Sequence, residues 1–235
     1  MEKETAVKNL DNLITKVEAS RLRVSGHHIV KIIGISKYSE ASDVATLYAV
    51  GQRAFGENKV QDLKTKSEEL NDLPLEWHFV GRLQKNKINN LIDLSPTLMQ
   101  SLDSIELAVE LNKKLEAKNK KMSCLLQINS AKEESKTGVM PEDAIAIYKQ
   151  IKETCPNIRL KGVMSIGAHV EDRKVIKESF DITKKIYDEL VPLGAKYCSM
   201  GMSSDFELAI ACGSNMIRVG STLFKNWLFK YYFLQ

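Results

Sequence analysis

Two loops of small residues lie close together near the end of the sequence and are suited to holding an anion. The first loop contains Ser203 and Ser204, and the second contains Gly220 and Ser221. Short side chains and hydroxyls allow backbone N–H groups to approach a phosphate without steric interference. In a (β/α)8 barrel, the loops after strands seven and eight commonly bind phosphate. The spacing therefore predicts a phosphorylated ligand at this place.

A lysine placed directly after the first apolar run supplies a possible nucleophile. Residues 29–36 read as a strand, and Lys37 follows them, so its amine is expected at the end of the barrel that carries the small-residue loops. Partial removal from water would lower the pKa of this amine, and a neutral amine can attack an aldehyde to form a Schiff base. Taken alone, Lys37 is explained more simply as a solvated loop lysine.

Polar residues follow other apolar runs as well. Asn58 comes soon after the run at 53–55, and Arg218 lies within the last run, at 216–219. Barrel enzymes gather their functional residues where the strands end. A lysine at this rim, together with loops that hold phosphate, describes a phosphorylated aldehyde as ligand. Pyridoxal 5′-phosphate (PLP) is the commonest candidate of that class.

The elements that must position these residues alternate between short apolar strands and amphipathic helices. Eight units of this kind give parallel βαβ pairs, and closure into a barrel removes exposed sheet edges. An open doubly wound sheet is the alternative, weakened because no G-x-G-x-x-G follows the first strand. The fold predicted for residues 1–235 is one α/β domain, a (β/α)8 TIM barrel with an extra N-terminal helix. That helix is expected at 4–22, and the strands at 29–36, 53–55, 77–80, 98–102, 122–129, 158–164, 195–200 and 216–219.

Composition is that of an ordinary globular protein and argues against several functional classes. The 235 residues are 43% hydrophobic and 27% charged, and the net charge is only +4, with lysines spread along helices. We therefore expect no nucleic-acid partner, and the lack of a long apolar run argues against a membrane segment. Four cysteines without C-x-x-C or metal-ligand spacing indicate a reducing, cytoplasmic location and no metal site.

The aromatic segment at 224–235, FKNWLFKYYFLQ, is unusual at the end of a barrel sequence. It is expected to form a last helix against the barrel wall, or else a contact between subunits, because an exposed aromatic patch is a liability on a monomer. The oligomeric state expected from the sequence is a monomer or a weak dimer.

Ordered motifs carry a resemblance to a known family. The segments are HHIVKIIGISKYSE, FGENKVQD, WHFVGRLQKNK, EESKTG and MGMSSDFELAIACGSNMIRVGS. Together they resemble the PLP homeostasis proteins, which share their barrel with the N-terminal domain of alanine racemase. The resemblance implies a single PLP-binding barrel. The positions that match the family's cofactor-binding residues are Lys37, Asn58, Ser203, Arg218, Gly220 and Ser221.

The resemblance also implies a role for each matched position. Lys37 would form the Schiff base, and Arg218 would face the pyridine nitrogen of PLP. Phosphate contacts would come from Ser203, Gly220 and Ser221, with Ser221 standing where the family usually has threonine. Asn58 would line the pocket.

An arginine at the pyridine nitrogen limits the chemistry expected of bound PLP. A guanidinium stays charged and disfavours a second positive charge on the ring, so PLP becomes a weaker electron sink. The resemblance implies a PLP-binding protein involved in intracellular PLP homeostasis. We expect it to hold PLP as a Schiff base on Lys37 without robust catalysis. Apo PLP-dependent enzymes are candidate recipients of the cofactor.

Two enzymatic alternatives stay open. The first is a PLP-dependent amino-acid racemase or isomerase. In the racemases that the resemblance implies as relatives, a separate C-terminal domain adds a tyrosine base. We expect no such domain in this sequence, although Tyr38 could serve as an internal base. The second is a Schiff-base aldolase acting on a sugar phosphate. Such an enzyme needs an acid–base pair around its lysine, and the segment 34–38 supplies no carboxylate.

Overall fold

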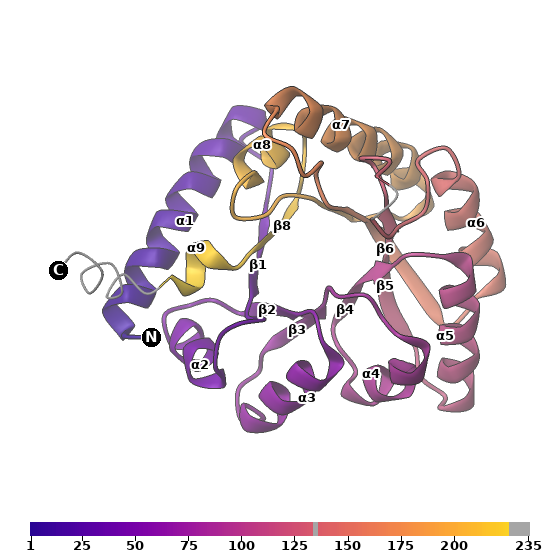
Figure 1. The fold of residues 1–235 in the computed structure, drawn as a ribbon, viewed down its shortest axis with the longest axis horizontal. Helices are drawn as coiled ribbons and strands as arrows, with labels where there is room; N and C mark the ends of the chain where they lie inside the picture. The colour runs from indigo at the N-terminus through magenta and orange to yellow at the C-terminus, as the bar shows by residue number, and fades with distance from the viewer. Residues whose placement is uncertain (134–135, 226–235) are drawn as a thin grey trace.

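The computed structural model describes residues 1–133 and 136–225 as a closed barrel of parallel strands surrounded by helices (Figure 1). The barrel closes because the first strand pairs with the last, Lys31 with Met216 and Gly34 with Val219. This confirms the predicted barrel and excludes the open sheet. In chain order the strands are β1 (Lys31–Ile35), β2 (Ala54–Glu57), β3 (Glu76–Phe79), β4 (Leu98–Leu102), β5 (Met122–Ile128), β6 (Ile158–Ser165), β7 (Tyr197–Ser199) and β8 (Met216–Val219).

The helices form the outer layer (Figure 1). The main ones are α1 (Lys3–Val24), α2 (Ala41–Ala49), α3 (Val60–Glu69), α4 (Ile88–Leu94), α5 (Ile105–Ala117), α6 (Ala144–Thr154), α7 (Arg173–Leu190), α8 (Phe206–Ala211) and α9 (Ser221–Phe224). Two short 3₁₀ helices, η1 (Lys85–Lys87) and η2 (Val191–Leu193), lie before α4 and after α7. Among the described residues, no helix has the length and apolar character needed to cross a membrane.

The apolar core lies in two layers. The larger layer packs the helices on the outer surface of the strands, with residues such as Phe79, Leu111 and Tyr148 wholly buried. A small cluster made of strand residues only fills the barrel interior: Ile33, Ala54, Leu98, Leu125, Met164 and Met216. Alternate residues of each strand therefore face the two layers, as a closed parallel sheet requires.

The predicted N-terminal helix is confirmed as α1, which packs along α8 and α9 (Figure 1). Leu10, Leu13 and Val17 recur at helical spacing and are buried in one cluster with Phe206 and Leu223. This contact fixes α1 beside the two small-residue loops that precede α8 and α9. The aromatic segment expected at the C-terminus falls, from residue 226 on, outside the described residues.

Two strands differ in extent from the sequence-based expectation in ways that matter for the site. The first strand begins at Lys31 rather than at residue 29, and Ser36 already belongs to the turn that carries Lys37. The second strand runs to Glu57, beyond the predicted end at Phe55. The reason is that Gly56 and Glu57 pair with His78 and Phe79 of β3, a contact that local sequence does not reveal.

Candidate functional site

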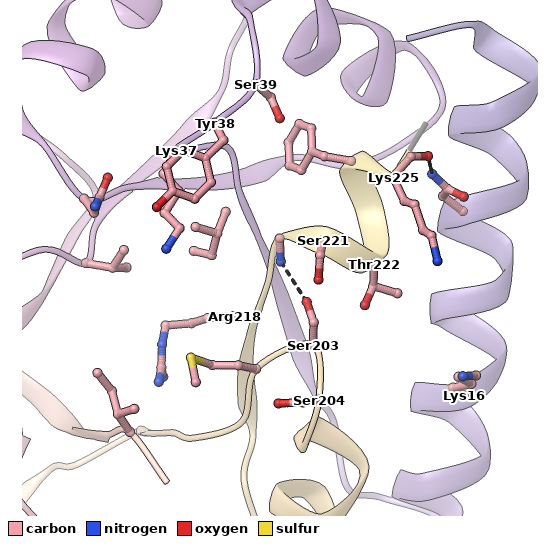
Figure 2. A pocket seen from close by; sticks show the side chains of 18 of the residues that line it. Lys16, Lys37, Tyr38, Ser39, Ser203, Ser204, Arg218, Ser221, Thr222 and Lys225 are labelled. Atoms are coloured by element: carbon pink, nitrogen blue, oxygen red, sulfur yellow. Dashed lines mark hydrogen bonds between the residues drawn. The ribbon is translucent and has the colours of Figure 1, made fainter. Parts of the chain in front are cut away.

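A cavity of about 1180 Å³ opens at the carboxyl ends of the strands, between the barrel and α1 (Figure 2). All six residues predicted to bind the cofactor line it: Lys37, Asn58, Ser203, Arg218, Gly220 and Ser221. They come from four strand ends that adjoin one another in the barrel, after β1, after β2, after β7 and at β8. Parallel strands in a barrel bring these distant segments of sequence to one rim.

Lys37 lies on the turn after β1 and extends into the cavity (Figure 2). Its side chain is exposed, so the expected partial removal from water is wrong for this structure. The ammonium lies 4.8 Å from the centre of the Tyr38 ring, close enough for a cation–π contact. Tyr38 itself is 90% exposed, as expected of a surface loop tyrosine.

A buried charged cluster holds the backbone immediately before Lys37. The Lys66 ammonium of α3 donates to Glu57 Oε1 at 2.6 Å and to the carbonyl of Ser36 at 2.6 Å. The Ser36 hydroxyl donates to the same Glu57 oxygen at 2.5 Å. Glu57 is fully buried and Lys66 nearly so. Since charge-assisted hydrogen bonds are strong, this cluster fixes the peptide from which the Lys37 side chain extends. The part that Lys66 plays in this cluster was not predicted from the sequence.

Asn58 borders the cavity just after Glu57 and carries an unsatisfied acceptor. Its Oδ1 atom is buried and has no hydrogen-bond partner among the residues that the structure describes. Buried amide oxygens are normally satisfied, so this atom is suited to a ligand that donates a hydrogen bond. Gly81 makes the local backbone path possible, because a Cβ at this position would lie 1.8 Å from the Asn58 carbonyl oxygen.

Arg218 occupies the opposite side of the cavity as a buried cation with neutral partners. The side chain is 5% exposed. One guanidinium nitrogen donates to Ser199 Oγ at 2.6 Å and the other to the Ser165 carbonyl at 2.8 Å. Burial lowers the pKa of Arg218 to about 10, while the nearby Asp205 carboxylate acts in the opposite direction. Arg218 therefore remains charged at neutral pH, and within residues 1–133 and 136–225 it forms no ion pair.

The two small-residue loops are joined to each other at the edge of the cavity. The backbone N–H of Gly220 donates to Ser203 Oγ at 3.2 Å, drawn as a dashed line in Figure 2. Ser221 and Thr222 begin α9 and also line the cavity. Gly201 permits the turn from β7 into this region, since its φ is +94° and a Cβ would lie 2.7 Å from that of Ala209. Hydroxyls and a helix start thus surround this part of the cavity.

Other residues of the site were not predicted from the sequence. Asn12 and Lys16 of α1 line the cavity (Figure 2 labels Lys16), although the sequence predicted their helix only as an addition to the barrel. Behind the cavity, His78 is buried inside the barrel and is hydrogen-bonded to Glu76 and Gln100. The hydrogen-bonded continuation from Gln100 towards Arg218 was missed.

Comparison with known proteins shows the family to which this chain is similar. A family model described as "Alanine racemase, N-terminal domain" matches residues 9–226. The pyridoxal phosphate homeostasis protein of Helicobacter pylori (strain ATCC 700392 / 26695) is 55% identical over 217 residues, which cover 92% of this chain and 97% of that protein. The human pyridoxal phosphate homeostasis protein is 36% identical over 207 residues, or 83% of this chain and 75% of that protein.

Solved structures show the same fold. The structure of PipY from Synechococcus elongatus PCC7942 with PLP bound superposes with a TM-score of 0.79 at 31% identity, over 93% of this chain and 99% of that one. Alanine racemase of Clostridium difficile 630 superposes with a TM-score of 0.72 at 18% identity, over 57% of its own chain, and shows the fold alone. The chain therefore belongs to the alanine racemase N-terminal domain family, and within it to the pyridoxal phosphate homeostasis proteins.

Proposed function

We propose that this chain binds PLP in the cavity at the carboxyl ends of its strands, as a Schiff base with Lys37, and acts in intracellular PLP homeostasis without robust catalysis. The observation that carries the proposal is the arrangement in Figure 2. Lys37 and Arg218 extend into the same space, and Ser203 and Ser221 lie across it. The PLP-bound PipY relative supports the choice of ligand.

The residues present fit each part of PLP. The Lys37 amine matches the aldehyde, and the hydroxyls of Ser203 and Ser221 match the phosphate. Arg218 is a donor that can face the pyridine nitrogen. The Oδ1 atom of Asn58, which has no partner among the described residues, can accept from a polar group of the ligand. When bound, PLP supplies a carbonyl that captures amines and a ring that withdraws electrons. Here the chain's own residues hold, orient and enclose that ring.

Among the described residues, the groups that line the cavity and could exchange a proton are lysines and Tyr38. None of its described lining residues is an aspartate, a glutamate or a histidine. Arg218 remains charged next to the expected position of the ring nitrogen, so it disfavours protonation there and weakens electron withdrawal by the ring. These two features support retention and release of the cofactor rather than turnover. We further propose a cytoplasmic location, supported by four cysteines that are all free and buried.

Hydride trapping tests the Schiff base. The protein is incubated with PLP, reduced with borohydride, digested and examined by mass spectrometry. We expect a pyridoxyl group on Lys37, with loss of the imine absorption band in Lys37→Ala. Two further lysines, Lys16 and Lys225, line the same cavity and provide internal controls. Lys16→Ala is the matched control variant and should keep the band. An adduct on Lys16 or Lys225, or no adduct at all, would contradict the proposal.

The racemase or isomerase alternative has one observation in its favour. Tyr38 lines the cavity beside Lys37 and could act as a second base. Exchange of the α-proton of amino acids in deuterated water, with saturating PLP, distinguishes the two functions. We expect no exchange above that of Lys37→Ala. Exchange that depends on both Lys37 and Tyr38 would instead establish an enzyme.

A further inference from the structure

A chain of buried hydrogen bonds runs from the guanidinium of Arg218 through the inside of the barrel. Its side chains come from β8, β7, β4 and β3, and none of the four from Arg218 to His78 is more than 5% exposed. The links are Arg218 Nη1 to Ser199 Oγ at 2.6 Å, Ser199 Oγ to Gln100 Oε1 at 2.7 Å, Gln100 Nε2 to His78 Nδ1 at 2.8 Å, and His78 Nε2 to Glu76 Oε1 at 2.9 Å.

Every link of the chain points in the same direction. A guanidinium only donates, so the Ser199 oxygen accepts from Arg218 and its own proton goes to the Gln100 carbonyl. The Gln100 amide N–H then donates to His78 Nδ1, which must be unprotonated. The imidazole proton is therefore on Nε2, facing Glu76. Hydrogen bonds aligned in one direction polarise and strengthen one another in a low-dielectric interior.

The far end of the chain is anchored by charge. Glu76 also accepts from the Lys31 ammonium. The hydrogen bond from His78 is the main cause that lowers the pKa of Glu76 to about 2, so Glu76 is ionised at neutral pH. Burial lowers the pKa of His78, which keeps the imidazole neutral. The chain thus leads from a buried cation at the cavity to a fixed carboxylate in the Glu76–Lys31 pair.

We propose that Ser199, Gln100 and His78 are positioning residues, which fix the plane of the Arg218 guanidinium so that its remaining donors face the cofactor ring. This inference rests on the proposed function. None of the three lines the cavity, so each acts through Arg218 alone. Burying polar side chains inside a barrel costs free energy that apolar residues would avoid. Their full mutual satisfaction instead restricts an otherwise rotatable side chain to one orientation.

Spectroscopy of the loaded protein tests the role. Ser199→Ala removes the first link, and we expect it to raise the Kd for PLP about tenfold and to shift the absorption band of the bound cofactor. Ser214→Ala is the matched control. Ser214 is also fully buried, but it donates to the carbonyls of Cys198 and Met200 and takes no part in the series of hydrogen bonds from Arg218 to Glu76. The Ser214→Ala substitution should lower stability and leave the absorption band in place. Ser199→Thr keeps the hydroxyl and should restore the band.

A second measurement needs no cofactor. Imidazole nitrogen NMR of the ligand-free protein, with His78 assigned by its loss in His78→Gln, should show a neutral ring protonated at Nε2. Gln100→Leu should change the His78 Nδ1 shift. If the His78 ring of the native protein is protonated at Nδ1, the proposed series of hydrogen bonds is wrong, whether or not the variants fold.

The outcomes separate this inference from the proposed function. A native protein that yields no trapped adduct on Lys37 rejects the proposed function and this role together. If the native protein yields the adduct, a Ser199→Ala variant whose Kd and absorption band match those of Ser214→Ala rejects the positioning role alone.

Discussion

The two sides of the cavity differ in the partners that surround their buried charged side chains. At the β1–β2 rim, which we define as Ser36, Lys37, Glu57, Asn58 and Lys66, a buried carboxylate and a buried ammonium neutralise each other within the protein. At the β7–β8 rim, defined as Ser203, Arg218, Gly220 and Ser221, a buried cation meets neutral oxygens.

The difference shows which rim serves stability and which serves binding. A buried charge that loses its partner is strongly destabilising, so the Glu57–Lys66 pair behaves as a unit of the fold. Arg218 has no such partner among the described residues, so its desolvation is compensated less completely. Functional sites often retain such features at the expense of stability. We therefore expect changes at the two rims to act in opposite directions on the free energy of unfolding.

The largest effect is expected at the β1–β2 rim. Lys66→Met leaves the Glu57 carboxylate buried without its cation and should lower the free energy of unfolding by about 3–5 kcal/mol. Urea unfolding of the ligand-free protein measures this. Lys64→Met is the control on the same helix, because Lys64 is paired with Glu68 at the surface and should matter little. Equal losses in the two variants would remove the distinction between the rims.

Arg218→Met should have the opposite effect on stability. It replaces a buried cation by an apolar side chain, and Ser199 keeps its bond to Gln100, so the free energy of unfolding should stay level or rise by about 1 kcal/mol. The Kd for PLP should increase on the order of 100-fold, because a charged donor to the ligand is lost. Unfolding and PLP titration are measured on one preparation. A destabilisation as large as that of Lys66→Met would show that Arg218 is part of the structural framework.

Ser203→Ala should affect binding more than folding. The hydroxyl accepts from the Gly220 N–H and is proposed to contact the phosphate, so its loss should raise the Kd for PLP about tenfold. Equilibrium dialysis against PLP gives the comparison. Ser204→Ala serves as control because Ser204 also lines the cavity but is not among the positions that match the family's cofactor-binding residues. Equal retention of PLP in both variants would reject the assignment of Ser203 to the phosphate.

The smallest effect concerns the pH dependence of the interior behind the β7–β8 rim. Burial lowers the pKa of His78 in the folded protein, so below about pH 6.5 the unfolded chain binds a proton that the folded chain does not. Stability should therefore fall as the pH drops below that value. Between pH 7 and 5.5 the free energy of unfolding should fall by about 1 kcal/mol more in the native protein than in His78→Gln. Urea unfolding of both proteins at several pH values measures this. The prediction is wrong if the free energy of unfolding depends on pH equally in the two proteins.

The order of strands and helices follows from local sequence, and so does the rim at which the six candidate site residues lie. Short apolar runs separated by amphipathic helices define the order of elements, and parallel order places every strand end at one rim. Ser203 and Gly220 could be grouped for this reason, although they are distant from Lys37 in sequence. The matching motifs then suggested a role for each residue, and these roles remain predictions.

Buried polar contacts could not be predicted in the same way. Lys66 lies in a polar stretch of α3 and carries no local sign that its ammonium reaches Glu57 and Ser36. Gln100 and Ser199 are 99 residues apart in the sequence, and their hydrogen bond exists only because both side chains point into the barrel. A two-residue period predicts alternation of faces, but it does not predict which inward-facing side chains meet.

The alternation of elements, the closed barrel and the rim at which chemistry is possible can be predicted from the sequence, because hydrophobic periodicity and small-residue loops are local features. The distribution of charge around the cavity is established only on folding. Burial and partner choice depend on side chains that converge from different elements, so the pairing of Glu57 with Lys66 and the neutral hydrogen-bond partners of Arg218 arise only when the barrel closes.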